Sequence, residues 1–515
     1  MRRWAAVFVC VALVFGVAAG CARKSGAPGV EAPKIKRLVF GLGSEPARLD
    51  PQDATDNPSY MATEHIYEKL VDFDEKMDIH PKLAESWEVK DEGLTWVFHL
   101  KKGVKFHDGT PFDARAVKAN FDRVLNPDNK LARHGLYAPY VDRVEAPDES
   151  TVVFRLKQPF GALLAHLAHS AGGIISPAAL EKYGKDIARN PVGTGPFKFK
   201  EWAPGDHITL VRNEEYWGTK PKLDELVFRP IPEGASRVMA LETGEVDVAY
   251  PVPATEVERL KGNPGLKVVV TPTLRVIYVG IKVTQKPFDN VKVRQALNYA
   301  VDKKAIVDTV LRGLAQVADS PLSPLTWGYS PTYTYAYDPE KAKQLLQEAG
   351  VKPGTRVKLW TPEGRYLMDR QTAEVVQNNL QAVGLEVDFQ KWEWAAYLDE
   401  LDKKQESPYE LFLLGWAPST GDADWGLRPL LGTDMADNNA LYSNPGLDKM
   451  LADAAAESDR AKRKALYADI QKLIMDEAPW IFLHVMHQTV GIRQGVEGVF
   501  ISPLEMIMFH AADKQ

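Results

Sequence analysis

The chain has 515 residues, of which 45% are hydrophobic and 26% are charged, and these proportions are ordinary for a globular protein. Its 63 basic and 69 acidic residues give a formal net charge of −6, so no basic excess points to nucleic acid or to an anionic membrane surface. A chain of this length is too long for one hydrophobic core and is expected to form two or three domains.

The N-terminal residues have the order of a bacterial export signal. A short basic region is followed by an uncharged apolar stretch over residues 4–17, and small residues precede Cys21. The apolar stretch is short for a helix that spans a bilayer. Small residues before a cysteine resemble a lipobox, in which the Cys21 sulfur is lipidated and the chain is cut in front of it. A plain signal peptide with a chance cysteine is the alternative.

After export, Cys21 would be the single cysteine of the mature chain, because Cys10 lies in the removed segment. No disulfide and no cysteine metal site are therefore expected. Residues 22–36 are rich in Gly, Pro, Ala and Lys without apolar periodicity, which indicates a flexible tether. The mature protein is expected to be a membrane-anchored lipoprotein that faces the periplasm or the cell exterior.

Short alternating strands dominate the first half of the mature chain. Thr95–Leu100 and Thr151–Leu156 alternate apolar and polar residues between turn residues, as half-buried strands do. Between them, residues 113–125 place Phe121 and Val124 on one helical face. The pattern predicts a mixed α+β segment.

The second half of the chain is typical of alternating strands and helices. Asp338 can cap a helix that begins at Pro339 and ends before Gly350. The sequence then predicts a strand over residues 357–360, a helix over 371–383 and a strand over 385–389. The two strands of such a βαβ unit should be parallel.

This topology indicates where a ligand would bind. In open parallel sheets, ligands lie beyond the carboxyl ends of the strands, where loops lead into helix N-termini. The loop over residues 361–370 has this position and contains Arg365, and a further apolar strand over residues 410–415 ends in the loop Trp416–Trp425. If the two strands are neighbours, both loops line one crevice.

Five stretches of the sequence resemble the family 5 extracellular solute-binding proteins of peptide, nickel and glutathione importers. They are residues 83–124, Asn190–Trp202 (NPVGTGPFKFKEW), Arg212–Trp217 (RNEEYW), Leu241–Asp247 (LETGEVD) and Pro287–Val307, in the order of the family. The resemblance covers nearly the whole mature chain and implies a mixed α/β, two-lobed fold of the periplasmic-binding-protein kind, type II, cluster C.

The resemblance also implies a division into three domains. Domain I would combine residues 37–70, 190–270 and 485–515, domain II would be an insertion over residues 71–189, and domain III would be residues 271–484. The two lobes, domains I and II on one side and domain III on the other, would close on the ligand.

Such a protein is not an enzyme and needs no cofactor or metal. The resemblance implies that a monomer captures glutathione or a di- or oligopeptide and delivers it to the membrane subunits of an ATP-binding-cassette importer. Two alternatives remain open: a receptor for a nickel chelate or haem on the same scaffold, and a surface peptidase. The sequence lacks the GxSxG and HExxH motifs that the commonest peptidase mechanisms use.

The loop that begins at Trp416 distinguishes members of the family. Dipeptide and oligopeptide binders resemble one another in carrying an Asp three residues after the corresponding Trp. In those proteins this Asp pairs with the amine of the ligand. Ser419 has that position here. The stretch Ser419–Trp425 (STGDADW) resembles the glutathione-binding members, so Asp422 and Asp424 are both candidates for the missing carboxylate.

Arg365 is the candidate partner for a carboxylate of the ligand. A guanidinium makes two parallel bonds to a carboxylate, and the following helix N-terminus adds a positive partial charge. A solvated surface arginine is the alternative. Trp416 and Trp425 are expected to cover the ligand with flat apolar rings, whereas Trp392 and Trp394 are expected to be structural.

The predicted strand over residues 274–281 offers two side chains to the cleft. Arg275 and Tyr278 are an odd number of residues apart, so only one of them can face it, and Tyr278 is the predicted one.

Three motifs resemble metal or phosphate sites of enzymes only superficially. His107-Asp108, Gly193-Thr194-Gly195 and the pair His484 and His487 lack the partners that metal or phosphate binding needs. They are expected to be structural.

Overall fold

The computed structural model of the protein describes residues 35–515. The predicted export signal, the lipidation site Cys21 and the tether up to residue 34 lie outside the described residues. None of the described helices combines the length and the apolar character needed to cross a bilayer.

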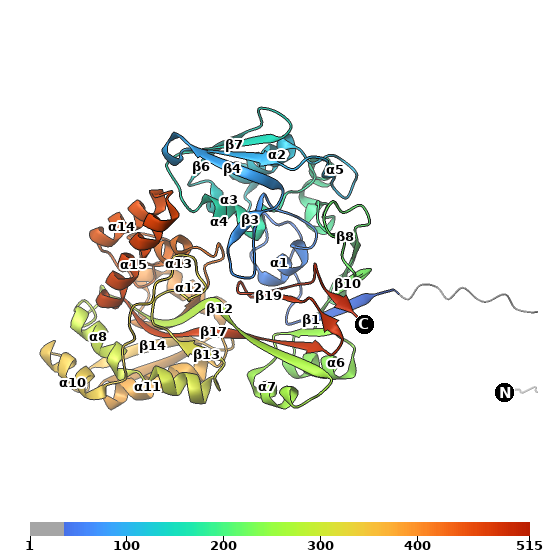
Figure 1. The fold of residues 1–515 in the computed structure, drawn as a ribbon. Helices are drawn as coiled ribbons and strands as arrows, with labels where there is room; N and C mark the ends of the chain where they lie inside the picture. Colours follow the sequence, from blue (N-terminus) through green and yellow to red (C-terminus); the bar gives the residue numbers. More distant parts are fainter. Residues whose placement is uncertain (1–34) are drawn as a thin grey trace, which may run out of the picture. The chain divides into compact units, whose positions relative to one another are not determined.

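An 11-stranded sheet runs in the order β15-β14-β16-β12-β17-β11-β1-β10-β9-β8, and β13 (Ala315–Val317) pairs with β17. Two long antiparallel strands, β12 (Leu266–Ile281) and β17 (Trp480–Arg493), lie at its centre and join the two halves (Figure 1). One half contains β15 (Glu386–Trp392), β14 (Arg356–Pro362) and β16 (Leu411–Trp416). The other contains β11 (Val248–Tyr250), β1 (Arg37–Leu42), β10 (Glu225–Pro230), β9 (His207–Arg212) and β8 (Phe197–Ala203).

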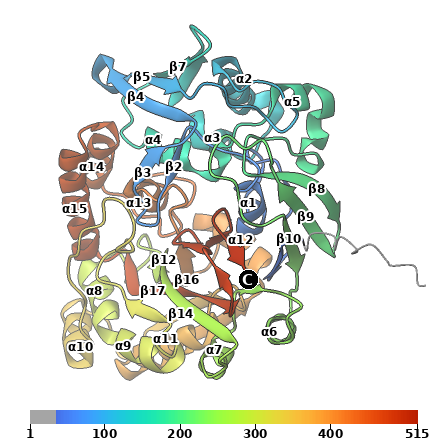
Figure 2. The ribbon, with the colours of Figure 1, turned by 45° about the vertical axis from the view of Figure 1, so that its right-hand side comes forward.

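A second sheet forms within the region predicted as an insertion. Its order is β4 (Ala84–Lys90), β5 (Thr95–Leu100), β7 (Thr151–Leu156) and β6 (Val141–Glu145). Helix α2 (Ala114–Leu125) lies beside these strands (Figure 2) and buries Phe121, whose ring centroid is 4.8 Å from that of Phe154. The α+β prediction for this segment is therefore confirmed.

The predicted βαβ unit is confirmed as well. Strand β14, helix α11 (Asp369–Ala382) and strand β15 follow one another, and the two strands pair in parallel from Arg356↔Glu386 to Pro362↔Trp392. Helix α10 (Pro339–Glu348) precedes them, and the Asp338 side chain caps it by accepting the Lys341 backbone N–H at 2.9 Å. Local signals in the sequence were sufficient here.

The remaining helices cover the sheet. They include α1 (Asn57–Thr63), α6 (Gly234–Thr243), α7 (Ala254–Lys261), α8 (Val291–Ala300), α12 (Trp394–Asp402), α13 (Ala423–Leu431), α14 (Pro445–Ala456) and α15 (Arg460–Glu477). Two hydrophobic clusters lie on opposite faces of β12, because Val276 and Tyr278 belong to one and Ile277 and Val279 to the other. The limits of the three proposed domains stay a prediction.

Candidate ligand-binding site

Two loops leave the carboxyl ends of neighbouring parallel strands. Strands β14 and β16 pair in parallel at Leu359↔Leu411 and Trp360↔Phe412. The loop before α11 and the loop before α13 therefore emerge at one edge of the sheet. This confirms the hypothesis that the two strands are neighbours.

The other half of the sheet contributes to the same place. Strand β11 is parallel to β1, and the chain that follows it faces residues 365–367 across a cavity of about 380 Å³. Strands β12 and β17 supply the rest of the wall. The lining residues are Arg237, Tyr250, Pro251, Val252, Pro253, Ala254, Thr273, Arg275, Leu314, Arg365, Tyr366, Leu367, Met486, His487, Gln488, Thr489 and Glu505. Its volume and its position at the carboxyl ends of the strands fit a small-molecule site.

An ion pair is set into the wall of this cavity. Arg275 on β12 donates to Glu505 from Nε at 2.7 Å and from Nη2 at 3.0 Å, and the two side chains are 13% and 15% exposed. Burial alone would lower the pKa of Arg275, but the Glu505 carboxylate raises this pKa above its ordinary value. The Gly415 carbonyl accepts from Arg275 at 3.5 Å and from the Tyr366 hydroxyl at 3.2 Å. The pair is thus tied to the end of β16.

Arg365 lies at the cavity, as the sequence predicted, and it is exposed. Its guanidinium carbon is 4.9 Å from the centroid of the Tyr366 ring and 5.0 Å from that of the Trp394 ring. The Asp369 carboxylate accepts its backbone N–H at 2.8 Å and so orders the loop before α11. Within residues 35–515, no carboxylate forms an ion pair with this arginine. Its charge is therefore available to a ligand.

Asp422 takes part in an ion pair inside the protein. It accepts from Arg463 at 2.6 and 2.7 Å, and the side chains of Arg463 and Asp422 are 3% and 5% exposed. It also caps α13 by accepting the Asp424 backbone N–H at 2.9 Å. Both oxygens of this carboxylate are thus used within the fold.

Asp424 is used in the same way. It pairs with Arg428 one helical turn later, accepts from the Tyr467 hydroxyl at 3.2 Å, and is 1% exposed. Ser419 is half-buried and carries no charge. A contact of Ser419, Asp422 or Asp424 with the ligand stays a prediction, and in this structure the two carboxylates stabilise the protein.

The two tryptophans of this loop contact each other. Trp416 Nε1 donates to the Trp425 carbonyl at 2.9 Å, and both side chains are half-buried. The Trp425 ring lies edge-on to His166 at 5.8 Å and packs against the hydrophobic cluster of the insertion. Trp392 packs on Trp360 at 4.6 Å, as expected of a structural residue. Contacts of Trp416 and Trp425 with a ligand stay predictions.

Tyr278 does not line the cavity. Its side chain is 2% exposed and stacks on Trp480 with the ring centroids 4.0 Å apart. Arg275 lines the cavity instead. Only one of the two side chains lines the cavity, as their odd separation predicted, but alternation alone does not say which side of β12 faces it. The choice of Tyr278 over Arg275 was therefore wrong.

Glu505 was not predicted at all. It lies in the turn between β19 (Phe500–Ser502) and β20 (Met506–Met508), and 230 residues separate it from Arg275. A single Glu in a short hairpin carries no periodic signal. Only the hydrogen bonds that hold this turn against distant segments reveal its position.

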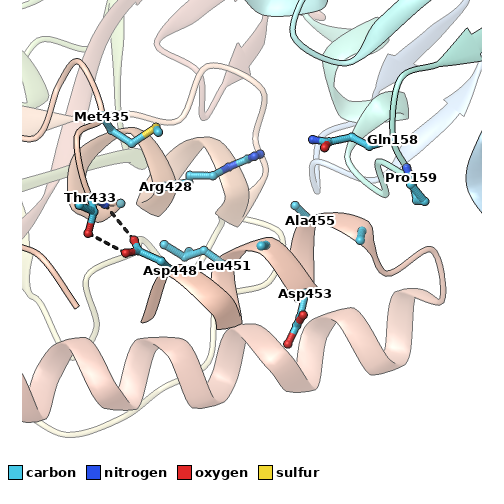
Figure 3. Close-up of a pocket in the computed structure, with 12 residues that line it drawn as sticks. Gln158, Pro159, Arg428, Thr433, Met435, Asp448, Leu451, Asp453 and Ala455 are labelled. Atoms are coloured by element: carbon cyan, nitrogen blue, oxygen red, sulfur yellow. Dashed lines mark hydrogen bonds between the residues drawn. The ribbon is translucent and has the colours of Figure 1, made fainter. Parts of the chain in front are cut away.

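A larger cavity of about 550 Å³ lies elsewhere (Figure 3). Gln158 and Pro159 line one side, and α13, α14 and the segment between them line the other. The Asp448 carboxylate accepts from the Thr433 backbone N–H at 2.9 Å and from its hydroxyl at 2.6 Å, and Arg428 is paired within α13. Because these polar groups already have partners, this cavity is the weaker candidate for a ligand.

Comparison with known proteins identifies the family. The model of the bacterial extracellular solute-binding proteins, family 5 middle, matches residues 78–438. The chain belongs to this family. The glutathione-binding protein GsiB of Pectobacterium atrosepticum is 40% identical to it over 486 residues, which are 93% of this chain and 94% of that protein. GsiB of Escherichia coli O157:H7 is 38% identical over 488 residues, 93% of this chain and 95% of that protein.

Solved structures agree with this family 5 assignment. HbpA2 from Haemophilus parasuis superposes with a TM-score of 0.85 at 27% identity and covers 93% of this chain and 100% of its own. The periplasmic binding protein DppA from Helicobacter pylori, in complex with the peptide STSA, has a TM-score of 0.77 at 29% identity and covers 92% and 98%. The protein has the type II periplasmic-binding-protein fold, as the resemblance implied.

Two of the motifs set aside in this family 5 chain make close structural contacts. His107 Nε2 is 2.9 Å from the Gly195 carbonyl oxygen, and burial lowers the pKa of His107 to about 4. A Cβ at Gly193 would lie 2.1 Å from the Ile66 carbonyl oxygen, so the glycine permits a close backbone contact. Within residues 35–515, no group of three or more His, Cys, Asp or Glu side chains could hold a metal ion. The relatives do not favour the nickel or haem alternative.

Proposed function

We propose that this family 5 protein is the exported receptor of an ATP-binding-cassette importer and captures glutathione or a short peptide in the cavity beside Arg365. One observation carries the proposal: both halves of the sheet direct loops to a cavity that contains an arginine without a carboxylate partner in the described chain. The relatives named as glutathione-binding, and the relative solved with the peptide STSA, support this ligand class.

The chemistry of binding follows from the lining. Arg365 would make parallel charge-assisted bonds to a carboxylate of the ligand. Movement of the two halves about β12 and β17 would then exclude water from the cavity. Because an unpaired buried charge is strongly unfavourable, a ligand without that carboxylate should bind much more weakly.

The rest of the proposal concerns partners. A lipid on Cys21 would anchor the chain at the membrane, and the closed monomer would deliver its ligand to the membrane subunits of the importer. The protein would perform no catalysis. Trp416, Trp425 and the segment around Ser419 would contact the ligand where it extends beyond the cavity, because they are not among its lining residues.

Titration calorimetry with the purified mature protein tests the proposal. Glutathione or a di- or tripeptide should give a saturable heat signal, and Arg365→Ala should weaken binding by about tenfold or more, as expected for the loss of a charge-assisted hydrogen bond. Arg356→Ala is the matched control, because this exposed arginine at the start of β14 pairs with Glu386 at the surface. If none of these ligands gives a heat signal, the proposed ligand class is refuted. If Arg365→Ala binds with unchanged affinity, the proposed role of Arg365 is refuted.

A further inference from the structure

The amine of the ligand needs a carboxylate that the loop after Trp416 does not supply. Asp422 and Asp424 are both buried and paired with arginines of the same protein. Among the residues that line the cavity beside Arg365, Glu505 is the single carboxylate. The position of Glu505 therefore decides where an ammonium group can bind.

The turn that carries Glu505 is held in place from three elements. Backbone carbonyls of residues 502–505 accept hydrogen bonds from the Leu274 backbone at 3.0 Å, from the Gln488 side chain at 2.8 Å, and from the Asn57 side chain at 3.1 and 3.2 Å. These donors belong to β12, β17 and α1. Little reorganisation is then needed when a ligand binds, which favours affinity.

The ion pair also has unused bonding capacity. A guanidinium has five N–H donors, and Arg275 uses Nε and one N–H on each of its terminal nitrogens toward Glu505 and Gly415. A carboxylate can accept about four hydrogen bonds, and Glu505 accepts two from Arg275. The side-chain oxygen of Gln488, a residue that is 5% exposed and lines the same cavity, is buried without a partner. A ligand that carries an ammonium group and a carboxylate on one carbon would satisfy these groups.

We infer that Glu505 and Arg275 together bind the amino-acid head of the ligand, with the ammonium on Glu505 and the α-carboxylate on Arg275; this rests on the proposed function. Glutathione is γ-linked, so its glutamyl residue keeps a free amine and a free carboxylate on one carbon, and its glycine carboxylate remains for Arg365. An ordinary peptide carries its amine and carboxylate at opposite ends. The site therefore selects γ-glutamyl compounds.

A binding cycle tests the inference. Wild-type protein and Glu505→Gln are titrated with glutathione and with glutathione acetylated on its amine. We expect acetylation to weaken binding to the wild type by about tenfold or more, and to weaken binding to Glu505→Gln by less than about threefold, because the charge pairing is already lost. Equal losses in both proteins would overturn the inference and leave the ion pair a purely structural role.

Two controls keep the result interpretable. Glu497→Gln changes an exposed carboxylate on the neighbouring strand β18 (Val496–Glu497) and should bind both ligands like the wild type. If Glu505→Gln does not fold, the wild type alone is compared with γ-Glu-Cys-Gly and its α-linked isomer, and equal affinities would overturn the inference. A wild type that binds neither glutathione nor any peptide would refute the proposed function itself, which is a different outcome.

Discussion

Replacing Asp422 by Asn should destabilise the protein strongly while leaving ligand binding largely intact. The substitution leaves the Arg463 guanidinium buried without its carboxylate, and breaking a buried ion pair in this way costs about 3–5 kcal/mol. Asn is as good an N-cap as Asp, so the start of α13 should lose little. The Trp327 and Tyr467 rings stay 4.5 and 5.1 Å from the guanidinium carbon and continue to stabilise it. We therefore expect a loss near the lower limit, about 3 kcal/mol.

Urea unfolding followed by circular dichroism measures this loss. Asp453→Asn is the matched control: its pair with Lys449 joins side chains that are 50% and 75% exposed, and such surface pairs contribute at most about 1 kcal/mol. A loss below about 1 kcal/mol in Asp422→Asn, together with a tenfold or larger loss of affinity for glutathione, would refute the reasoning. Asp422 would then be the ligand anchor that the sequence suggested.

Further predictions concern close packing and pH. Gly193→Ala should lower the unfolding free energy by about 3 kcal/mol or more, because its Cβ would lie 2.1 Å from the Ile66 carbonyl oxygen. Gly135→Ala is the control, because its Cβ would meet nothing within 4 Å, and it should be neutral. Equal melting temperatures of the two variants would contradict this prediction. Gly161→Ala would place a Cβ 2.1 Å from the Glu457 carbonyl, so hydrogen exchange should become faster around α14, and unchanged exchange would be contrary to the structure. Burial lowers the pKa of His166 and His510 to about 4, below the unfolded value of about 6.5, so the unfolded chain binds more protons between these limits. The contribution of these histidines to the unfolding free energy should be constant above pH 7 and fall by up to about 1.4 kcal/mol per pH unit for each of them between pH 6.5 and 4. A flat profile over this range in denaturant titrations would count against their burial.

Local signals were enough to predict much of the second half of the fold. The cap at Asp338 marked the start of α10, and Gly384 marked the end of the helix in the βαβ unit that follows, whose two strands pair in parallel. Arg365 was found for the same reason, since its place after β14 puts it at the edge of the sheet where ligands bind.

The positions that the sequence did not decide all depend on distant contacts. Asp422 finds its arginine 41 residues later on α15, and no local pattern says whether a carboxylate faces a ligand or an internal cation. Alternation showed that only one of Arg275 and Tyr278 could face the cleft, and the packing of Tyr278 on Trp480 leaves that side to Arg275. Glu505 reaches Arg275 across 230 residues. The tertiary structure decides which partners these side chains have, and a local sequence pattern does not show those partners.

The central claim is that the ligand binds where loops from both halves of the sheet converge. A crystal structure of the mature protein with bound glutathione tests this most directly. We predict ligand density between Arg365 and Glu505, with the glycine carboxylate on the arginine. Density in the cavity between Gln158 and α14, or on an outer surface, with the cavity beside Arg365 containing only water, would contradict the account.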